Sequence, residues 1–240
     1  MAVAQQNDRS PALRTRLTRE RILLGAVELA DDEGLAALSM RKLGQKLGVE
    51  AMSLYNHVAN KDGLLDGMVD LVFDEIGLPP DVDWKAAMRE RAKAARAALS
   101  HHPWAIGLME SRTKPGPATL RHHDAVIGCL REAGLSVALA AHAYSLLDSY
   151  IYGFTLNQQS LPFEASNVAA LGSSMLHAFP ASEYPHLAEF ITEHAMKPGY
   201  DYANEFEFGL DLILQGLERI RFDQLQDGHS VDPGSASPPR

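Results

Sequence analysis

Cysteine is the scarcest residue of this sequence, because Cys129 is the only one among 240 residues. A single cysteine excludes an internal disulfide framework and a zinc site built from thiolates, and it fits a reducing cytoplasm. Long apolar segments are scarce as well: the uncharged run from Ala133 to Leu147 ends at Asp148 and is shorter than the roughly 20 residues of a membrane span. The N-terminal residues contain no apolar core of a secretory signal. We therefore expect a cytoplasmic protein without a membrane segment.

Strand signals are also missing. Period-two alternation of apolar and polar residues is absent, whereas apolar residues recur at helical spacing along most of the chain. With 46% apolar and 22% charged residues, the composition is that of a folded globular protein rather than a disordered one. Its 240 residues exceed the usual size of a single domain. The predicted fold class is all-α, with a small helical domain joined to a larger one.

The net charge of -9 argues against a nucleic-acid partner, but the charge is distributed unevenly. Residues 1–61 hold 9 Lys and Arg against 7 Asp and Glu, a net +2, whereas residues 62–240 hold 13 against 24, a net -11. A locally basic end is compatible with binding to nucleic acid. An ordinary solvated tail is the alternative, and charge alone does not decide between the two.

The first 80 residues predict four helices, which are separated by caps and stops. Thr18 and Ser39 are typical helix N-caps, and Gly34 and Gly48 are typical stops. The segment 77–80, with one glycine and two prolines, ends the fourth helix. The expected ranges are 19–33, 40–47, about 50–58 and 61–76.

The third of these helices has few apolar residues for a helix of a core. At about 100° per residue, Ala51, Leu54 and Val58 cluster on one side, which would pack on the preceding helices. The remaining sides present Met52, Ser53, Tyr55, Asn56 and His57 to a partner. A helix, a glycine turn and a second short helix form the geometry that places such a surface in the major groove of DNA.

Asn60 and Lys61 begin the fourth helix. Asn60 can cap it, and the free amides of the helix N-terminus together with the charge of Lys61 suit a DNA phosphate. Tyr55 and His57 are within reach of the same DNA backbone. The alternative is that these two side chains are merely half-buried and that Lys61 is solvated.

The segment from Leu17 to Asp70 resembles the DNA-binding domain of TetR-family transcriptional regulators, including the signature that Tyr55, His57, Asn60 and Lys61 form. The resemblance implies a DNA-binding domain at 16–76, with its helix-turn-helix at 39–58. By position, the residues implied to contact DNA are Ser39, Met40, Arg41, Ala51, Met52, Ser53, Tyr55, Asn56, His57 and Lys61. The tetracycline repressor has proline at the position of Met52 and tryptophan at that of Asn56, so its operator sequence is not carried over.

Two further segments, Trp84 to Trp104 and Ser111 to Ser136, are similar to the ligand-binding domain of the tetracycline repressor subgroup. The similarity implies an effector-binding and dimerisation domain at 80–222, between tails at 1–15 and 223–240 that we expect to be flexible. The helices expected at 136–158 and 202–221 resemble the family's dimerisation helices. The implied protein is a homodimeric repressor that binds a pseudo-palindromic operator in double-stranded DNA and is released by a small molecule.

The effector side of the resemblance departs further from the tetracycline repressor. Arg112 and His123 fall at the positions of a pocket arginine and glutamine, but a histidine of the tetracycline and magnesium site would fall near Gly77. A tetracycline-magnesium effector is therefore not expected. The candidate effector-binding residues are Arg91, Trp104, Met109, Arg112, His123, Tyr150 and Phe154, which combine apolar walls with a few polar anchors. Plain core packing is the alternative for each of them.

Two pairs of adjacent histidines, at 101–102 and 122–123, raise the question of a metal site. Neighbouring residues on a helix point about 100° apart, so such a pair is not expected to hold one ion. No Ser, His and Asp order, phosphate loop or paired metal motif indicates catalysis. We therefore expect no catalytic residues, no metal and no cofactor. The alternative is an all-α enzyme or a metal-binding protein that uses histidines and carboxylates of the C-terminal domain.

Overall fold

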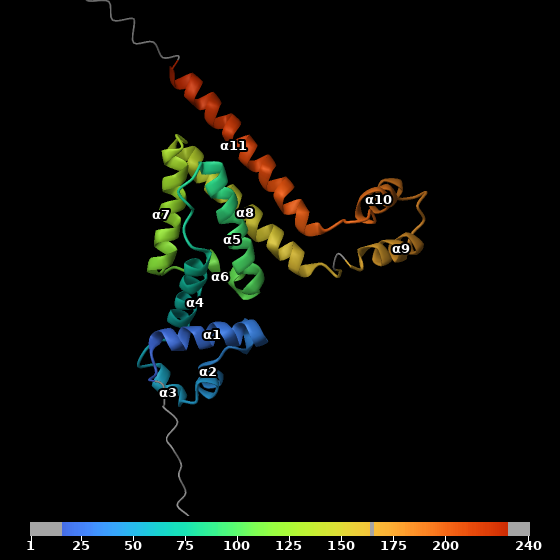
Figure 1. Ribbon diagram of the computed structural model, residues 1–240. Helices are drawn as coiled ribbons and strands as arrows, with labels where there is room; N and C mark the ends of the chain where they lie inside the picture. Colours follow the sequence, from blue (N-terminus) through green and yellow to red (C-terminus); the bar gives the residue numbers. More distant parts are fainter. Residues whose placement is uncertain (1–15, 164–165, 230–240) are drawn as a thin grey trace, which may run out of the picture. The chain divides into compact units, whose positions relative to one another are not determined.

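The computed structural model describes residues 16–163 and 166–229, and helices form all the regular structure in those ranges (Figure 1). The predicted all-α class is confirmed. The chain divides into two compact units, Met1 to Met68 and Val69 to Arg240, whose boundary falls inside α4 (Lys61–Ile76). The sequence places the boundary after that helix instead. Residues 1–15 and 230–240 of the expected tails lie outside the described residues.

The first unit contains α1 (Arg19–Glu33), the 3-10 turn η1 (Leu35–Ala37), α2 (Met40–Leu47), α3 (Ala51–Leu54) and the first part of α4. The predicted caps are confirmed, because the Thr18 and Ser39 hydroxyls each accept a hydrogen bond at 3.2 Å from the amides of Arg21 and Lys42. Glycines with positive φ end both α1 and α2, also as predicted.

The helix α3 is shorter than the predicted range 50–58. After Leu54 the backbone turns more tightly, because the His57 amide donates to the Leu54 carbonyl, only three residues back, at 2.9 Å. Val58 remains buried, as does Leu54. The predicted length was therefore wrong, but the segment turns the expected side toward the core.

Gly44 sets how closely α2 approaches the start of α3. A β-carbon at this position would lie 2.9 Å from the carbonyl oxygen of Val49 and 3.2 Å from the nitrogen of Ala51. Both are backbone atoms, which no side-chain rotation can move away. The Val49 amide also donates to the Gly44 carbonyl at 2.9 Å. The turn between the two helices therefore requires glycine here.

The second unit contains the rest of α4 and the helices that follow. They are α5 (Trp84–His101), η2 (Pro103–Ala105), α6 (Ile106–Met109), α7 (Pro117–Glu132), α8 (Val137–Ser160), α9 (Val168–Ala178), α10 (Pro185–Phe190), the π-helical turn η3 (Ile191–Ala195), η4 (Tyr202–Asn204) and α11 (Glu205–His229). The long helix α8 packs against α5, α7 and α11. None of the described helices is long and apolar enough to span a bilayer.

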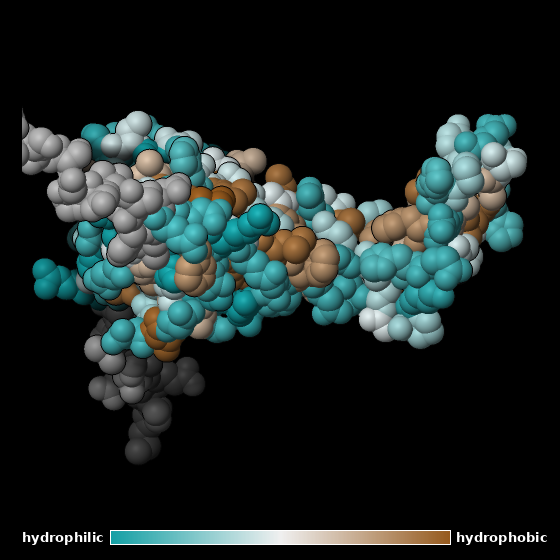
Figure 2. All heavy atoms as spheres, turned by 90° about the horizontal axis from the view of Figure 1, so that it is seen from above, coloured by the Kyte–Doolittle hydropathy of each residue, from teal (hydrophilic) through white to brown (hydrophobic). Residues whose placement is uncertain are grey.

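The helices α9 and α10 form a separate small segment of the second unit. Both pack against η3, and Figure 1 shows them beyond the ends of α8 and α11. Large apolar side chains are exposed here, at Met175, Leu187 and Phe190, and Figure 2 shows hydrophobic residues among hydrophilic ones on this segment. The segment thus buries little of its own apolar surface.

The helix α11 continues through His229, so residues 223–229 of the expected tail are helical. The first proline after Asp223 is Pro233, so no residue of this stretch lacks a backbone donor for the helix. The polar composition that suggested a tail is equally suited to the exposed end of a helix.

We predict that Gly44→Ala destabilises the first unit by about 1–3 kcal/mol, because the strain of overpacking exceeds a gain in helix propensity of up to about 1 kcal/mol. Gly63→Ala in α4 is the matched control, since its β-carbon would meet only the Asn60 Oδ1 atom, at 3.5 Å. Thermal unfolding followed by circular dichroism measures both variants. Equal unfolding midpoints would contradict the close approach of α2 to α3.

Candidate nucleic-acid interface and buried polar cluster

The segment of α3 divides into a buried and an exposed side, as the sequence predicts. Leu54 is fully buried, whereas Met52 is 76% exposed and Tyr55 and Asn56 are exposed as well. The half-buried residues at its flanks are Ala51, Ser53 and His57. An apolar tip, a phenol and an amide therefore project together from a helix that the core holds in place.

The neighbouring helix α2 adds part of the predicted contact set. Ser39 and Arg41 are exposed, but the Met40 side chain is buried. The Met40 side chain therefore belongs to the core rather than to the exposed face, and its contact with DNA stays a prediction. Its position, three and four residues before Leu43 and Gly44, places it on the inner face of the helix with those two buried residues.

Arg41 is the basic side chain of α2 that stays available. Lys42 forms an ion pair with Glu33, and Lys46 lies within 3.4 Å of two carboxylates of α1. Among the described residues, Arg41 takes part in no ion pair. Its guanidinium therefore remains free to meet a phosphate or a base edge, which are typical partners of arginine on DNA.

The start of α4 is held by two polar contacts. Asn60 Oδ1 accepts a hydrogen bond from the Gly63 amide at 2.8 Å, which confirms the predicted cap. Lys61 Nζ donates to the Leu38 carbonyl at 2.9 Å, yet the Lys61 side chain stays exposed. Lysine has three donors, so one can tie α4 to the chain before α2 while the others face solvent.

A buried polar cluster lies inside the second unit. Arg91 of α5 and Asp148 of α8 are 4% and 5% exposed and form an ion pair through Nη2 and Oδ1. Arg91 Nε also donates to His122 Nε2 of α7 at 3.3 Å, and His122 Nδ1 donates to the Gly77 carbonyl at 2.7 Å. These bonds connect α5, α7 and α8 to the residue that follows α4.

The histidines of the cluster are neutral at pH 7. Burial, reinforced by the nearby Arg91 charge, lowers the pKa of His122 to about 4. Burial also lowers the pKa of His123. It raises the pKa of the Tyr144 hydroxyl, which the Asp148 charge raises further. The cluster therefore holds one positive and one negative charge, which cancel.

Four buried polar atoms of this cluster have no hydrogen-bond partner in the part of the chain that the structure describes. They are Arg91 Nη1, His123 Nε2, Tyr144 Oη and Asp148 Oδ2. Tyr144 lies beside Asp148, whose charge and carboxylate both raise the pKa of its hydroxyl, but the contact falls short of good hydrogen-bond geometry. The His123 ring contacts Phe73 and Tyr144 edge-on, with centroids 5.2 and 5.5 Å apart. Each unsatisfied buried group costs about 1–3 kcal/mol, so these four atoms would each gain from a further hydrogen-bond partner, such as water or a ligand.

Comparison with known proteins matches both units. Residues 22–68 match the family described as "Bacterial regulatory proteins, tetR family", and residues 76–221 match "Tetracyclin repressor-like, C-terminal domain". The chain belongs to the TetR family. It is therefore a DNA-binding transcriptional regulator, as the resemblance of its first 70 residues predicts.

Similar members of the TetR family include the HTH-type transcriptional repressor DrrR1 of Streptomyces coeruleorubidus, 34% identical over 84% of this chain and 77% of that protein. Tetracycline repressor protein class C of Escherichia coli is 30% identical over 86% of this chain and 93% of its own. ActR of Streptomyces coelicolor in complex with actinorhodin has a TM-score of 0.71 and 31% identity, over 86% of this chain and 99% of that one. These relatives are regulators, which favours a regulator over the enzyme alternative.

The structure distributes the candidate effector residues of this TetR-family chain over three places. Arg91 and His123 belong to the buried polar cluster. Trp104 and Met109 are buried in the segment formed by η2 and α6. Arg112 follows α6, so it belongs to this second place, and it is half-buried. Of the seven candidates chosen by their position in the family, the structure thus brings only Arg91 and His123 together in this cluster.

Tyr150 and Phe154 lie in the third place and contact α11 rather than the polar cluster. Tyr150 Oη donates to the Phe206 carbonyl at 3.0 Å, and the two rings stack with centroids 5.5 Å apart. Phe154 stacks on Tyr202 at 5.0 Å. At about 100° per residue, these two lie roughly 80–120° around α8 from Tyr144. The structure therefore supports the core-packing alternative for them.

Asp148, Tyr144 and His122 are the residues of the cluster that the candidate effector set lacks. One signal was present, because Asp148 is the only charged residue of α8. A lone carboxylate in the middle of a long, apolar helix is rarely buried unless a cation pairs with it. Nothing in the sequence indicated that the cation would be Arg91, 57 positions away.

An open hollow of about 570 Å³ lies elsewhere on the second unit. Its lining includes Asp81, Asp83, Asp124 and Cys129 and none of the candidate effector residues. Burial raises the pKa of the Cys129 thiol, so the thiol stays protonated at neutral pH. The hollow thus offers negative charge without a reactive nucleophile.

One pair of adjacent histidines behaves differently from the prediction. The rings of His101 and His102 stack with centroids 4.4 Å apart, because His102 lies past the end of α5 and no longer follows helical spacing. The expectation that they diverge was therefore wrong. His122 and His123 both lie within α7, and their rings are 6.2 Å apart and nearly perpendicular, as expected.

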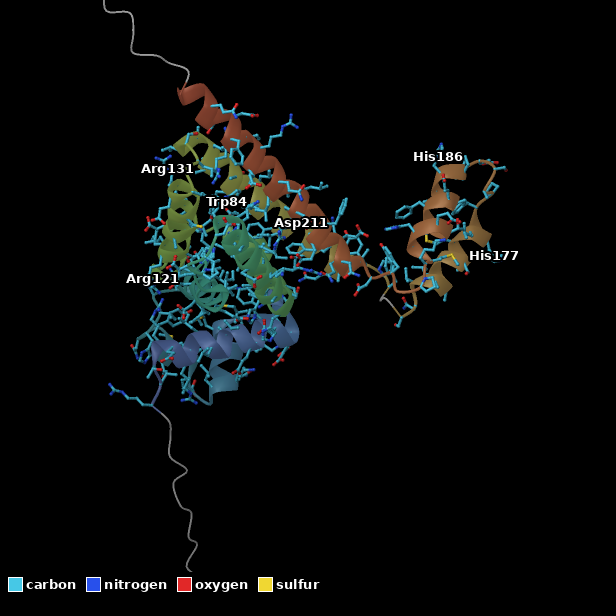
Figure 3. The ribbon with its side chains drawn as sticks, turned by 45° about the horizontal axis from the view of Figure 1, so that its top comes forward. Trp84, Arg121, Arg131, His177, His186 and Asp211 are labelled. Atoms are coloured by element: carbon cyan, nitrogen blue, oxygen red, sulfur yellow. The ribbon has the colours of Figure 1, made fainter. Side chains whose placement is uncertain are left out.

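We predict that Arg41→Ala and Tyr55→Ala each weaken operator binding by about 1–3 kcal/mol without unfolding the protein, as for the loss of one good contact. Fluorescence anisotropy at fixed low salt measures the affinity, because salt weakens phosphate contacts. Arg121→Ala is the charge-matched control, since Arg121 lies on α7 in the second unit (Figure 3). Wild-type affinity in both Arg41 and Tyr55 variants would count against the α2 and α3 face.

Proposed function

We propose that this protein binds a pseudo-palindromic operator as a cytoplasmic homodimer, represses transcription there and is released by a small-molecule effector. The observation that carries the proposal is the exposed face of α2 and α3, on which Arg41, Met52, Tyr55 and Asn56 stand over a buried core. In helix-turn-helix dimers the second helix enters the major groove, and half-sites lie about 34–36 Å apart. A gel shift on fragments of the source genome at low salt tests the proposal, and retention of no fragment would overturn it.

Apolar side chains exposed on two long helices support the homodimer. Those on α8 are Val137, Leu146 and Leu156, and those on α11 are Phe208, Leu212, Ile220 and Phe222. Phe208, Leu212 and Phe222 fall within about 80° around the axis of α11 and form one stripe, whereas Ile220 lies outside it. The residues that α11 buries, Phe206, Leu210 and Leu214, occupy another side. Because α8 and α11 pack together, a second copy would complete a four-helix interface over the stripe.

We predict that the protein sediments at twice the 26.2 kDa of one chain and that Leu212→Glu dissociates it, because a charge would be buried at the centre of the interface. Leu120→Glu is the matched control, since Leu120 on α7 is 56% exposed and Leu212 is 57% exposed. Analytical ultracentrifugation measures both variants. A dimeric Leu212→Glu variant, or a monomeric wild type, would contradict the interface.

The buried polar cluster is the proposed effector site. Its two formal charges cancel, so an ionic ligand would leave a buried charge without a partner. Arg91 Nη1 can only donate and Asp148 Oδ2 can only accept, so the ligand needs an acceptor and a donor close together. The rings of Phe73, His123 and Tyr144 suit a flat aromatic body. These features describe a neutral aromatic compound that carries hydroxyl and carbonyl groups.

The link from effector to operator runs through α4. Phe73, in its last turn, contacts the rings of His122 and His123 with centroids 5.2 Å apart. Lys61, in its first turn, belongs to the unit that carries the operator-reading face. A ligand that packs around Phe73 therefore acts on a helix that both units share. Release requires that the ligand prefer the conformation with the lower affinity for DNA, and the difference in affinity sets the size of the response.

We predict that Tyr144→Phe raises the effector concentration needed for operator release about two- to twelvefold, which corresponds to one neutral hydrogen bond of about 0.5–1.5 kcal/mol. Stability should be unchanged or higher, because the hydroxyl has no partner among the described residues. The probes are neutral hydroxylated aromatic carbonyl compounds, together with actinorhodin, because ActR has been solved with it. Tyr184→Phe, at an exposed tyrosine, is the control. Identical release curves for Tyr144→Phe and wild type would exclude this hydroxyl from the site.

A further inference from the structure

Glu75, His101 and His102 bring three metal-ligating side chains together outside the polar cluster. Glu75 lies in the last turn of α4, His101 is the last residue of α5 and His102 follows it. One ligand atom from each of the three lies within 4.8 Å of the others. Among the described residues, this is the one group of three such side chains.

The neighbouring Pro103 explains why two adjacent histidines face the same way. Proline disfavours helical backbone at the residue before it, and His102 accordingly has φ -118° and ψ 68°. The His102 amide still donates to Ala98 at 2.8 Å, so the chain leaves the helix only at this residue. Because the backbone leaves the helix at His102, the two side chains do not point about 100° apart as neighbours on a helix do. Their imidazole rings stack instead.

Each oxygen of the Glu75 carboxylate has one of the imidazoles next to it. Oε2 lies 2.9 Å from His102 Nε2, and Oε1 lies 3.8 Å from His101 Nδ1. A hydrogen bond between Glu75 and His102 would account for the distance of 2.9 Å but not for the position of His101. The second imidazole, that of His101, brings a third ligand atom within 4.8 Å of the other two, as a shared ion would need.

We propose that Glu75, His101 and His102 bind a divalent transition-metal ion of the zinc type. Two imidazole nitrogens and one carboxylate oxygen suit Zn²⁺, whereas Mg²⁺ and Ca²⁺ prefer oxygen ligands alone. Bonds of about 2.0–2.2 Å place the ligands of one Zn²⁺ within about 4.2 Å of each other. The side chains of His101 and Glu75 are 71% and 45% exposed, so their rotation closes the remaining distance.

The burial of the three groups fits an open site with an entry path. The His102 side chain is buried and forms the wall, while His101 lies on the solvent side. Three protein ligands leave a fourth position for water or another small molecule. The bound ion would join the end of α4 to the end of α5, within the second unit.

The test uses full-length protein without an affinity tag, first stripped of metal with a chelator. Competition with a chromophoric zinc indicator measures stoichiometry and affinity, and the absorption of bound Co²⁺ reports the ligand set. We expect one tight equivalent per chain, and a loss of affinity of at least about tenfold in His101→Ala and in Glu75→Gln, because even outer-shell changes cost 10–100-fold. Glu75→Gln keeps the shape of the side chain and a hydrogen-bonding group for His102.

His186→Ala is the control for adventitious binding, since His186 lies on α10 with its side chain 97% exposed (Figure 3). Unchanged zinc affinity in both His101→Ala and Glu75→Gln, or an equal loss in His186→Ala, would overturn the proposal. Zn²⁺ should also raise the thermal midpoint of the wild type but not of the two ligand variants. Operator binding is measured separately, in the presence of chelator. Failure to bind zinc would therefore not count against operator binding, and failure to bind the operator would not count against the metal site.

Discussion

The second unit depends on the ion pair between Arg91 and Asp148. Both groups are almost fully buried, so removing either would leave a charge without a partner, at a cost of about 3–5 kcal/mol. The pair fixes α5 to α8, and His122 extends the connection to Gly77 at the end of α4. It leaves one atom of each partner unsatisfied, Nη1 and Oδ2. The contact that assembles the unit therefore also leaves one donor and one acceptor for the ligand that we propose.

The first unit shows the opposite arrangement, in which an apolar core positions polar groups on the outside. A helix as short as α3 has no stability of its own in water, so packing must hold it. Leu54 anchors it in the core, and Gly44 allows α2 to lie against its start. Lys61 ties the start of α4 to Leu38 in the same region. Side chains that a rigid scaffold orients in this way lose little further freedom on binding.

Local features of the sequence predicted the first unit well. Caps at Thr18 and Ser39 and a stop at Gly48 depend on neighbours within four residues, so sequence alone reveals them. Sequence alone was less informative where a neighbouring element decides. Met40 points inward because α2 is covered on that side, and α3 ends early because its last turn tightens. In the second unit, family position indicated Arg91 and His123, while periodicity correctly placed the long helices.

The sequence by itself determined the helical class, most helix ends, the exposed side of α3 and the family to which the chain belongs. These properties follow from spacing and capping within one turn or from a motif along one stretch of chain. Only the tertiary structure decided that Asp148 meets Arg91 and that Tyr150 turns toward α11 instead. It also decided that Glu75 lies beside two stacked histidines. Such contacts join residues far apart in the chain, and they depend on how whole helices pack, which the periodicity of a single helix does not specify.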